Sequence, residues 1–401
     1  MINRKLYLDK IRPFFNQDII KVLTGMRRCG KSVMLELIKE ELLDSGTSEE
    51  AILSYNFESL KIAHLCNAQA LYKDVTAKIS SITGKVYLFF DEIQEVRDWE
   101  KTINSLRVDL DCDIYITGSN SRLLSSDLAT YLAGRYVEFI IYPFSFLEFI
   151  EVYKGIKKDI SIQDCFRQYL LYGGLPYLYN LNYSDEPVRQ YLRDLYNAVE
   201  LKDIIKRKEI RDVALLERIF SFVLFNIGNT FSATTVSKYL KNEGIKVTAE
   251  TVLNYLKAGS EAYLFYKIKR QDLIGKKILS VNEKYYLADH GLRESMLGRN
   301  MADINLILEN IVFIELKRRG YEVTVGKYQD KEIDFIAERQ ENKIYIQVAY
   351  LLASDETIER EFGVYMHIRD NYPKYVLSLD EFDMSRDGII HMNIRDFLML
   401  Q

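Results

Sequence analysis

A glycine-framed loop at residues 25–32 carries the clearest chemical signal in this sequence. It reads Gly25-Met26-Arg27-Arg28-Cys29-Gly30-Lys31-Ser32 and matches the full G-x-x-x-x-G-K-[ST] pattern. Glycines at the two framing positions let the backbone curl, so that its N–H groups face phosphate oxygens. Lys31 then places a positive charge at the β- and γ-phosphates, and the Ser32 hydroxyl is a ligand for Mg²⁺. The whole loop is therefore predicted to bind ATP together with Mg²⁺.

An acidic pair, Asp91-Glu92, follows the apolar run Val86–Phe90. Such a run is typical of a strand buried in a parallel sheet, and ligands bind beyond the carboxyl ends of those strands. We expect Asp91 to hold Mg²⁺ with Ser32, directly or through water, and Glu92 to polarise the water that attacks the phosphate. The alternative is a solvated Asp-Glu pair at the start of a helix.

The surrounding elements fit this chemistry. Ile19–Thr24 reads as a buried strand leading into the loop, and apolar residues at helical spacing follow it as far as Gly46. A third strand, Ile114–Thr117, ends in a Gly-Ser-Asn turn, which is also a common turn sequence. Either Ser119 or Asn120 is predicted there as a polar group that senses the γ-phosphate or the water.

Two arginines, Arg122 and Arg135, follow this region. Either is a candidate for the cation that stabilises negative charge in the transition state. The alternative for each is a surface or ion-paired arginine.

Taken together, these motifs resemble the AAA+ class of P-loop ATPases, and more closely the predicted bacterial ATPases allied to the STAND group. The resemblance also covers Glu92–Val96 with Trp99, the Gly134–Phe146 segment, and the Gly-Gly-x-Pro at 173–176. It implies a five-stranded parallel sheet with an α-helical lid over the nucleotide. It further implies that Arg135 is an arginine finger or sensor, and that Gly174 and Pro176 lie near the nucleotide base.

Charge is unevenly distributed along the 401 residues, although the formal net charge is only −4. Residues 1–200 carry 24 basic and 28 acidic side chains, residues 201–300 carry 18 and 11, and residues 301–401 carry 12 and 19. A basic block with a net charge of +7 therefore lies between two acidic parts. Only this block is suited to nucleic acid.

The basic block has the pattern of a helix-turn-helix followed by a hairpin, which together predict a winged helix. Helices are expected at 215–227, after Ser232 and at 249–257, with hairpin strands at 264–270 and 277–287. The basic side chains of the predicted wing are Lys267, Lys269, Arg270, Lys276 and Lys277. On the third helix, Thr248, Thr251, Asn254 and Lys257 are expected to project outward. DNA contact through residues 248–277 and a protein-packing role are left as equal alternatives.

The acidic C-terminal part shows an αβββαβ order that resembles the PD-(D/E)xK nuclease-like domain. Glu309 and Asp334 match two of the family's metal ligands, but Gln347 and Ala349 stand where a carboxylate and a lysine are needed. Glutamine does not offset the charge of a metal ion, and alanine cannot orient a water. We therefore expect a binding or scaffold domain without nuclease activity, in which Glu309 and Asp334 pair with Lys317, Arg318 or Lys331.

The predicted fold class is α/β: a P-loop AAA+ sheet at 1–145, a helical lid at 146–205, a winged helix at 206–295 and an inactive nuclease-like domain at 296–401. The four scattered cysteines, the charged N-terminus and the short apolar runs indicate a cytoplasmic protein without a membrane segment. The predicted function is Mg²⁺-dependent ATP hydrolysis, with Glu92, Lys31 and Arg135 as catalytic residues, driving a conformational switch that acts on or near DNA. The alternatives are a nucleotide-gated interaction protein with negligible turnover, acting through a protein partner or self-assembly, and a metal-dependent nuclease.

Overall fold

The computed structural model describes residues 2–121, 132–199, 204–205, 210–273, 275, 277–298 and 300–400. The chain falls into two compact units. The first contains residues 1–141 and 261–263, and the second contains residues 142–260 and 264–401. Within the described ranges, no helix combines the length and the apolar character needed to cross a bilayer.

The first unit is built on a five-stranded sheet with the order β2-β3-β4-β1-β5, in which every neighbouring pair is parallel. The strands are β1 Ile20–Thr24, β2 Ile52–Asn56, β3 Val86–Asp91, β4 Cys112–Thr117 and β5 Tyr136–Ile140. All residues of β1, β3 and β4 are buried, as expected for parallel strands covered on both faces. The predicted α/β class and the five-stranded parallel sheet are confirmed.

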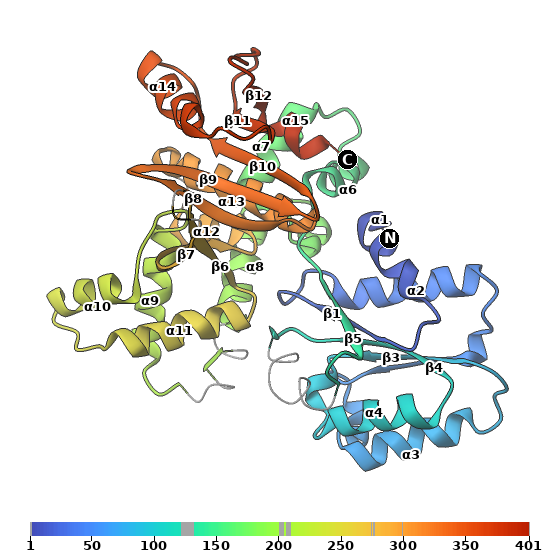
Figure 1. The fold of residues 1–401 in the computed structure, drawn as a ribbon. Coiled ribbons are helices and arrows are strands. Elements are labelled where there is room, and N and C mark those ends of the chain that lie inside the picture. Colours follow the sequence, from blue (N-terminus) through green and yellow to red (C-terminus); the bar gives the residue numbers. More distant parts are fainter. Residues whose placement is uncertain are drawn as a thin grey trace. The chain divides into compact units, whose positions relative to one another are not determined.

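Helices cover both faces of this sheet: α2 lies on one face, and α3 and α4 lie on the other (Figure 1). The helices are α1 Lys5–Ile11, α2 Lys31–Asp44, α3 Ala68–Ile79 and α4 Trp99–Asp109. Short 3₁₀ turns occupy Arg12–Phe14, Glu49–Ala51, Leu60–Leu65 and Ile93–Glu95. On the α2 face, the rings of Phe89 and Tyr115 stack with centroids 4.6 Å apart. On the other face, Leu71, Ile103 and Leu106 pack against the strands.

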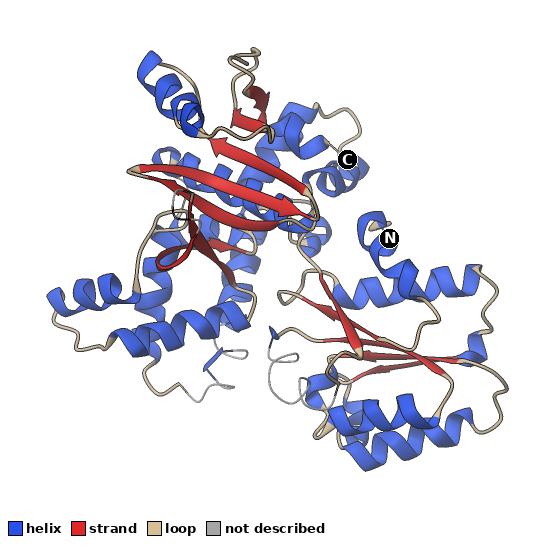
Figure 2. Ribbon diagram, viewed as in Figure 1, coloured by secondary structure: helices blue, strands red, loops and turns tan. Residues whose placement is uncertain are grey.

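The second unit begins with a run of helices, drawn in blue in Figure 2. Before its sheet come α6 Phe146–Ile156, α7 Ile162–Tyr172, α8 Asp185–Ala198, α9 Val213–Phe225, α10 Ala233–Asn242 and α11 Ala249–Glu261, with a 3₁₀ turn at Pro176–Leu181. Ser145 and Glu148 form a capping box at the start of α6, and Ser232 caps α10. The predicted helices around 215–227, after Ser232 and from 249 are thus present.

A mixed seven-stranded sheet, with the order β12-β11-β10-β9-β8-β6-β7, forms the centre of the second unit. Its strands are β6 Phe265–Asp272, β7 Lys277–Leu287, β8 Glu322–Tyr328, β9 Lys331–Arg339, β10 Asn342–Val348, β11 Lys374–Ser378 and β12 Ile390–Asn393. The accompanying helices are α12 His290–Leu297, α13 Ile304–Arg318, α14 Asp355–Gly363 and α15 Ile394–Met399, with 3₁₀ turns at Met301–Asp303 and Tyr365–His367. The expected αβββαβ order therefore runs from α13 to β11.

Two features of this sheet differ from the expectations. The predicted hairpin, β6–β7, is not separate: β6 also pairs in parallel with β8, with Arg270 opposite Val325. The helix expected at 355–370 ends at Gly363, and β12 and α15 extend the domain beyond the expected elements. The predicted ranges 146–205 and 296–401 lie in the second compact unit, as does 206–295 except for residues 261–263. The division of these ranges into separate domains stays a prediction.

Candidate functional site

The glycine-framed loop leaves the carboxyl end of β1 and enters α2, as the sequence predicted. Gly25 and Gly30 have φ values of 133° and 102°, and Arg28 adopts a left-handed φ of 65°. A side chain on Gly25 would collide with the carbonyl oxygen of Ile141. The tight curl of the loop therefore depends on glycine at this position.

The start of α2 is arranged to receive an anion. Its N-cap is Gly30, which provides no side-chain cap, so the first-turn N–H groups are available to an external acceptor. Lys31 is 4% exposed, and its ammonium donates to the carbonyl oxygens of Gly25 and Met26 at 3.1 Å each. Its charge is thus fixed at the mouth of the loop, beside the helix N-terminus.

Ser32 and Asp91 lie together, although they come from different elements. Asp91 is the last residue of β3, and its carboxylate accepts hydrogen bonds from the hydroxyls of Ser32 and Thr117. Burial raises the pKa of Asp91 in spite of these two bonds. One hydroxyl and one carboxylate oxygen at this position are the hard oxygen ligands that Mg²⁺ prefers, so the residues present fit the predicted metal.

Glu92, the residue after Asp91, takes a left-handed φ of 54° and approaches the loop. One carboxylate oxygen lies 3.9 Å from the Lys31 ammonium and accepts a 2.6 Å bond from Ser119; Gln94 donates to the other oxygen. Burial alone would raise the pKa of Glu92, but Lys31 and these two donors outweigh it and lower the pKa. Glu92 is therefore held as a carboxylate.

The end of β4 supplies the third strand of the site. Ser119 contacts Glu92 directly, whereas Asn120 lies in the same turn and is 5% exposed. Thr117, which the sequence analysis did not single out, bridges the acidic pair: its hydroxyl donates to Asp91 and accepts from the backbone N–H of Glu92 at 2.9 Å. Its place at the strand end was the one signal that could have identified it.

Two further residues of the loop, Arg27 and Cys29, have contacts of their own. Cys29 is fully buried, and burial raises the pKa of its thiol. Arg27 pairs with Glu58 at 2.9 Å. The guanidinium of Arg4, just before α1, is 2% exposed and donates to the Cys29 carbonyl at 3.0 Å. No sequence signal pointed to this arginine.

Arg135 lies far from Lys31 and Glu92. It precedes β5, and its carbonyl accepts from the N–H of Ile20, the first residue of β1, at 2.9 Å. The five residues of β1, roughly 16 Å of strand, separate this amino end of the sheet from the loop. The Arg135 guanidinium instead donates to Asn104 at 3.0 Å. The structure therefore does not bring Arg135 to the site of its own chain, and Arg122 is outside the described residues.

The Gly-Gly-x-Pro segment is fixed within the second unit. The N–H of Gly174 donates to Asp289 at 2.7 Å, and its carbonyl accepts from Phe144 at 2.7 Å. Asp289 also accepts from the N–H of Gly291 at 2.9 Å, yet burial raises the pKa of Asp289 to about 7. Pro176 begins a 3₁₀ turn.

Several basic side chains of the predicted wing already have acidic partners. Lys267 lies 2.6 Å from Glu283, and Arg270 lies 3.4 Å from Glu332. Lys269 is exposed, and Lys276 lies outside the described residues. On α11, Asn254 and Lys257 are exposed. The hydroxyls of Thr248 and Thr251 bond to each other at 2.9 Å.

In the C-terminal part, Glu309 and Asp334 do pair with a lysine, but it is Lys284 of β7. Its ammonium lies 3.4 Å from Glu309, 3.7 Å from Asp334 and 2.7 Å from Glu332. The prediction that Lys317, Arg318 or Lys331 is the partner was wrong. It relied on proximity in sequence, whereas pairing within the sheet brings β7 to Glu309 and Asp334. Lys331 instead donates to a backbone carbonyl, and Arg318 pairs with Glu315.

Gln347 joins this cluster through hydrogen bonds. Its amide oxygen accepts from the N–H of Asp334 at 2.7 Å, and its amide nitrogen donates to Glu361 at 2.9 Å. In the part of the chain that the structure describes, no three His, Cys, Asp or Glu side chains are grouped so that they could hold a metal ion. The position between the carboxylates is taken by the Lys284 ammonium.

Comparison with known proteins gives two family matches. Residues 17–150 match the family described as "AAA domain", and residues 163–303 match a "Domain of unknown function (DUF8612)". Among solved structures, the Walker-type ATPase PABY2304 of Pyrococcus abyssi covers 74% of this chain and 95% of its own, with a TM-score of 0.53 and 16% identity. This likeness shows a shared fold.

Two relatives cover most of the sequence. An "Uncharacterized protein" of Haemophilus influenzae is 38% identical over 100% of this chain and 99% of its own length. "Uncharacterized protein MJ1544" of Methanocaldococcus jannaschii is 30% identical over 90% of this chain and 82% of its own. With its phosphate loop, acidic pair and five-stranded sheet, the chain belongs to the same family as these two proteins, and its amino-terminal part is an AAA-type P-loop ATPase domain.

Proposed function

We propose that this protein binds ATP with Mg²⁺ and hydrolyses it at the loop between β1 and α2. The observation that carries the proposal is the convergence of Lys31, Ser32, Asp91, Glu92 and Ser119 at the carboxyl ends of β1, β3 and β4. Each group has the type and charge that phosphoryl transfer needs.

In this proposal the loop N–H groups and Lys31 bind the phosphates. Ser32 and Asp91 hold Mg²⁺, which supplies positive charge against the phosphate oxygens. Glu92, kept as a carboxylate by Lys31 and Ser119, orients a water and accepts its proton as the water oxygen bonds to the γ-phosphorus. The bond to the β-phosphate oxygen breaks, and ADP and phosphate leave.

The test is Glu92→Gln, which keeps the shape of the side chain and removes its basicity. We expect steady-state phosphate release to fall by about 10²–10⁴-fold, the usual contribution of a general base. ATP binding should persist, because Lys31 and the loop are unchanged. Glu50→Gln, an exposed site in the same unit, is the matched control. Unchanged release in Glu92→Gln would show that another group acts as the base.

A nucleotide-gated switch with negligible turnover is the second candidate. It is supported by the engagement of both Glu92 oxygens, one by Ser119 and one by Gln94. Retained nucleotide in the purified protein with background turnover would favour this candidate over the enzyme.

We propose that Arg135 can act as an arginine finger only between neighbouring chains of an assembly. Within one chain it lies at the amino ends of β1 and β5, whereas the loop lies at the carboxyl end of β1. Mass measurement in solution with and without ATP·Mg²⁺ tests this. If the protein stays monomeric under both conditions, Arg135 is not a finger, and Arg135→Ala should then hydrolyse ATP at the normal rate.

We further propose that residues 213–287 form a winged helix that serves mainly in protein packing. The order of three helices and a hairpin supports the fold, and the ion pairs of Lys267 and Arg270 reduce the charge available to phosphates. DNA contact is the alternative. A salt-dependent shift of labelled DNA, lost in Lys269→Ala with Lys257→Ala, would establish that contact.

For residues 296–401 we propose a nuclease-like scaffold without nuclease activity. This is supported by Gln347 at a ligand position and by the Lys284 ammonium between Glu309 and Asp334. Nicking of DNA that requires a divalent cation and is lost in Asp334→Ala would overturn this assignment.

A further inference from the structure

A cavity of about 310 Å³ opens on the second unit, well apart in sequence from the phosphate loop. Its walls come from the end of β6, the end of β8, the strand β10 and the segment after the Tyr365–His367 turn. The volume is at the lower end of the roughly 300–1,000 Å³ typical of small-molecule sites. It therefore suits one small ligand rather than a folded partner.

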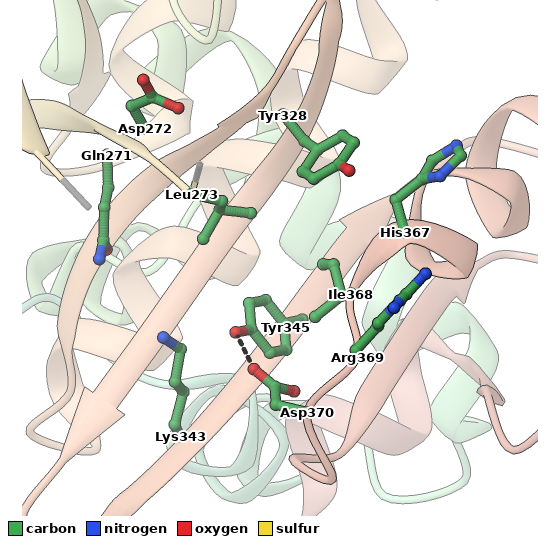
Figure 3. A pocket seen from close by; sticks show the side chains of 10 residues that line it. All are labelled: Gln271, Asp272, Leu273, Tyr328, Lys343, Tyr345, His367, Ile368, Arg369 and Asp370. Carbon is green, nitrogen blue, oxygen red and sulfur yellow. Dashed lines mark hydrogen bonds between the residues drawn. The ribbon is translucent and has the colours of Figure 1, made fainter. Parts of the chain in front are cut away.

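Flat rings form much of the wall. Tyr328 and His367 stack with centroids 5.2 Å apart and an interplanar angle of 3°. Tyr345, at the back of the cavity, is 1% exposed and is fixed by a 2.5 Å bond from its hydroxyl to Asp370 (Figure 3). The Tyr328–His367 pair presents a preformed surface on which a heteroaromatic ring can stack. The Tyr345 ring is covered by the ammonium groups of Lys343 and Lys374 and serves as part of the wall.

The polar lining of the cavity contains donors and acceptors: Lys343, Arg369 and the Tyr328 hydroxyl are donors, and Asp272 and Asp370 are carboxylates. Within the described residues, the Arg369 guanidinium and the Tyr328 hydroxyl make no hydrogen bond or ion pair, and Arg369 extends beside His367 at the rim (Figure 3). Lys343 adds an ammonium whose partner, Glu338, is 3.1 Å away and half exposed. The Asp370 carboxylate is already engaged by Tyr345 and Lys374. The Arg369 guanidinium and the Tyr328 hydroxyl are therefore the donors that can bind acceptor groups of a ligand.

We propose that this cavity is a second nucleotide site, distinct from the phosphate loop. A stacking surface together with the free donors of Arg369 and Tyr328 matches a planar base that carries a phosphate. Arg369 and Lys343 supply charge for the phosphate, and the Tyr328–His367 pair supplies the stacking surface. The nucleotide is either free or part of a single strand; the two share this chemistry.

The experiment uses the full chain with Lys31→Ala, which disables the phosphate loop. Equilibrium dialysis with labelled ATP and anisotropy with a fluorescent oligothymidylate report the two forms of the ligand. Saturable binding of either probe, in a ratio of one per chain, is expected. Binding of ATP alone assigns a free nucleotide, and binding of the oligonucleotide alone assigns a nucleotide within a strand.

Second-site variants are then made in the same background. The double change His367→Ala with Arg369→Gln should weaken binding of the probe roughly 5- to 150-fold, because one base-stacking contact and one positive charge are lost. Arg167→Gln, an exposed arginine on α7 of the same unit, should leave binding unchanged. Absence of binding in Lys31→Ala, or equal binding after the His367 and Arg369 changes, would overturn the proposal. Since the phosphate loop is disabled throughout, neither result depends on ATP hydrolysis.

Discussion

Replacing Lys284 by methionine should destabilise the second unit strongly and in a pH-dependent manner. The Lys284 side chain is 4% exposed and lies among Glu332, Glu309 and Asp334 at 2.7, 3.4 and 3.7 Å. Removing one partner from a buried ion pair costs about 3–5 kcal/mol, because the remaining charges stay buried without compensation. Glu332 is 32% exposed, so solvent can stabilise its charge. The loss of stability therefore comes from the buried charges of Glu309 and Asp334.

The pH dependence follows from the same two carboxyls. Burial raises the pKa of Glu309 and of Asp334 in the folded protein, and Lys284 opposes both shifts. Without the ammonium, both pKa values rise further above their unfolded values, so the variant loses stability as the pH rises through that range. The difference between variant and parent should therefore be larger at pH 8 than at pH 5.

Hydrogen exchange of amides in β7 and β9 measures the local free energy of opening at each pH. Lys267→Met is the matched control, because Lys267 lies on the same hairpin and its pair with Glu283 is 40% exposed on the lysine side. That change should cost less than about 1 kcal/mol. If Lys284→Met costs no more than the control, or costs the same at both pH values, the buried-cluster reasoning is wrong.

Three further changes address the proposed nucleotide site and a buried carboxyl of the second unit. Arg4→Met removes the charged hydrogen bond to the Cys29 carbonyl, so ATP affinity should fall about tenfold or more with little change in kcat; equal affinity in an ATP titration would exclude a positioning role for Arg4. Ser119→Ala removes a donor that lowers the pKa of Glu92, so the acid limb of the pH–rate profile should move to higher pH, and Ser119→Thr should restore it. A profile that does not move would contradict the contact. The pKa of Asp289 is about 7 in the folded protein and near 3.8 in the unfolded chain, so the stability of the wild type falls as the pH rises between these values. In Asp289→Asn the temperature of thermal unfolding should no longer depend on pH in this range. An unchanged pH dependence in the variant would contradict the raised pKa.

The residues of the proposed nucleotide site could be found from sequence because they lie in short contiguous motifs. The loop from Gly25 to Ser32 is contiguous, and Asp91-Glu92 directly follows the apolar run Val86–Phe90, which is typical of a buried strand. Parallel strands then bring their carboxyl ends to one edge without further information. The match to an AAA domain over residues 17–150 agrees with this interpretation.

The parts that sequence could not predict depend on strand order. Arg135 follows the predicted sensor turn in sequence. However, β5 pairs in parallel with β1, so the start of β5 lies beside the start of β1, at the end of the strand opposite the loop. Lys284 is 25 residues from Glu309 and reaches it only because β7 belongs to the C-terminal sheet. Arg4 gave no signal at all, since its partner is a backbone carbonyl 25 residues away. Pairing register, rather than residue type, decides these contacts.

The pairing of β6 with β8 has a practical consequence for shortened chains. A fragment that stops before residue 322 would contain the helices and hairpin of the basic block, but β6 would lose its parallel neighbour. The backbone N–H and C=O groups of that edge would then be free to pair with other molecules, which is the usual origin of edge-to-edge aggregation. Fragments intended for solution work should accordingly keep β6 and β8 in one polypeptide.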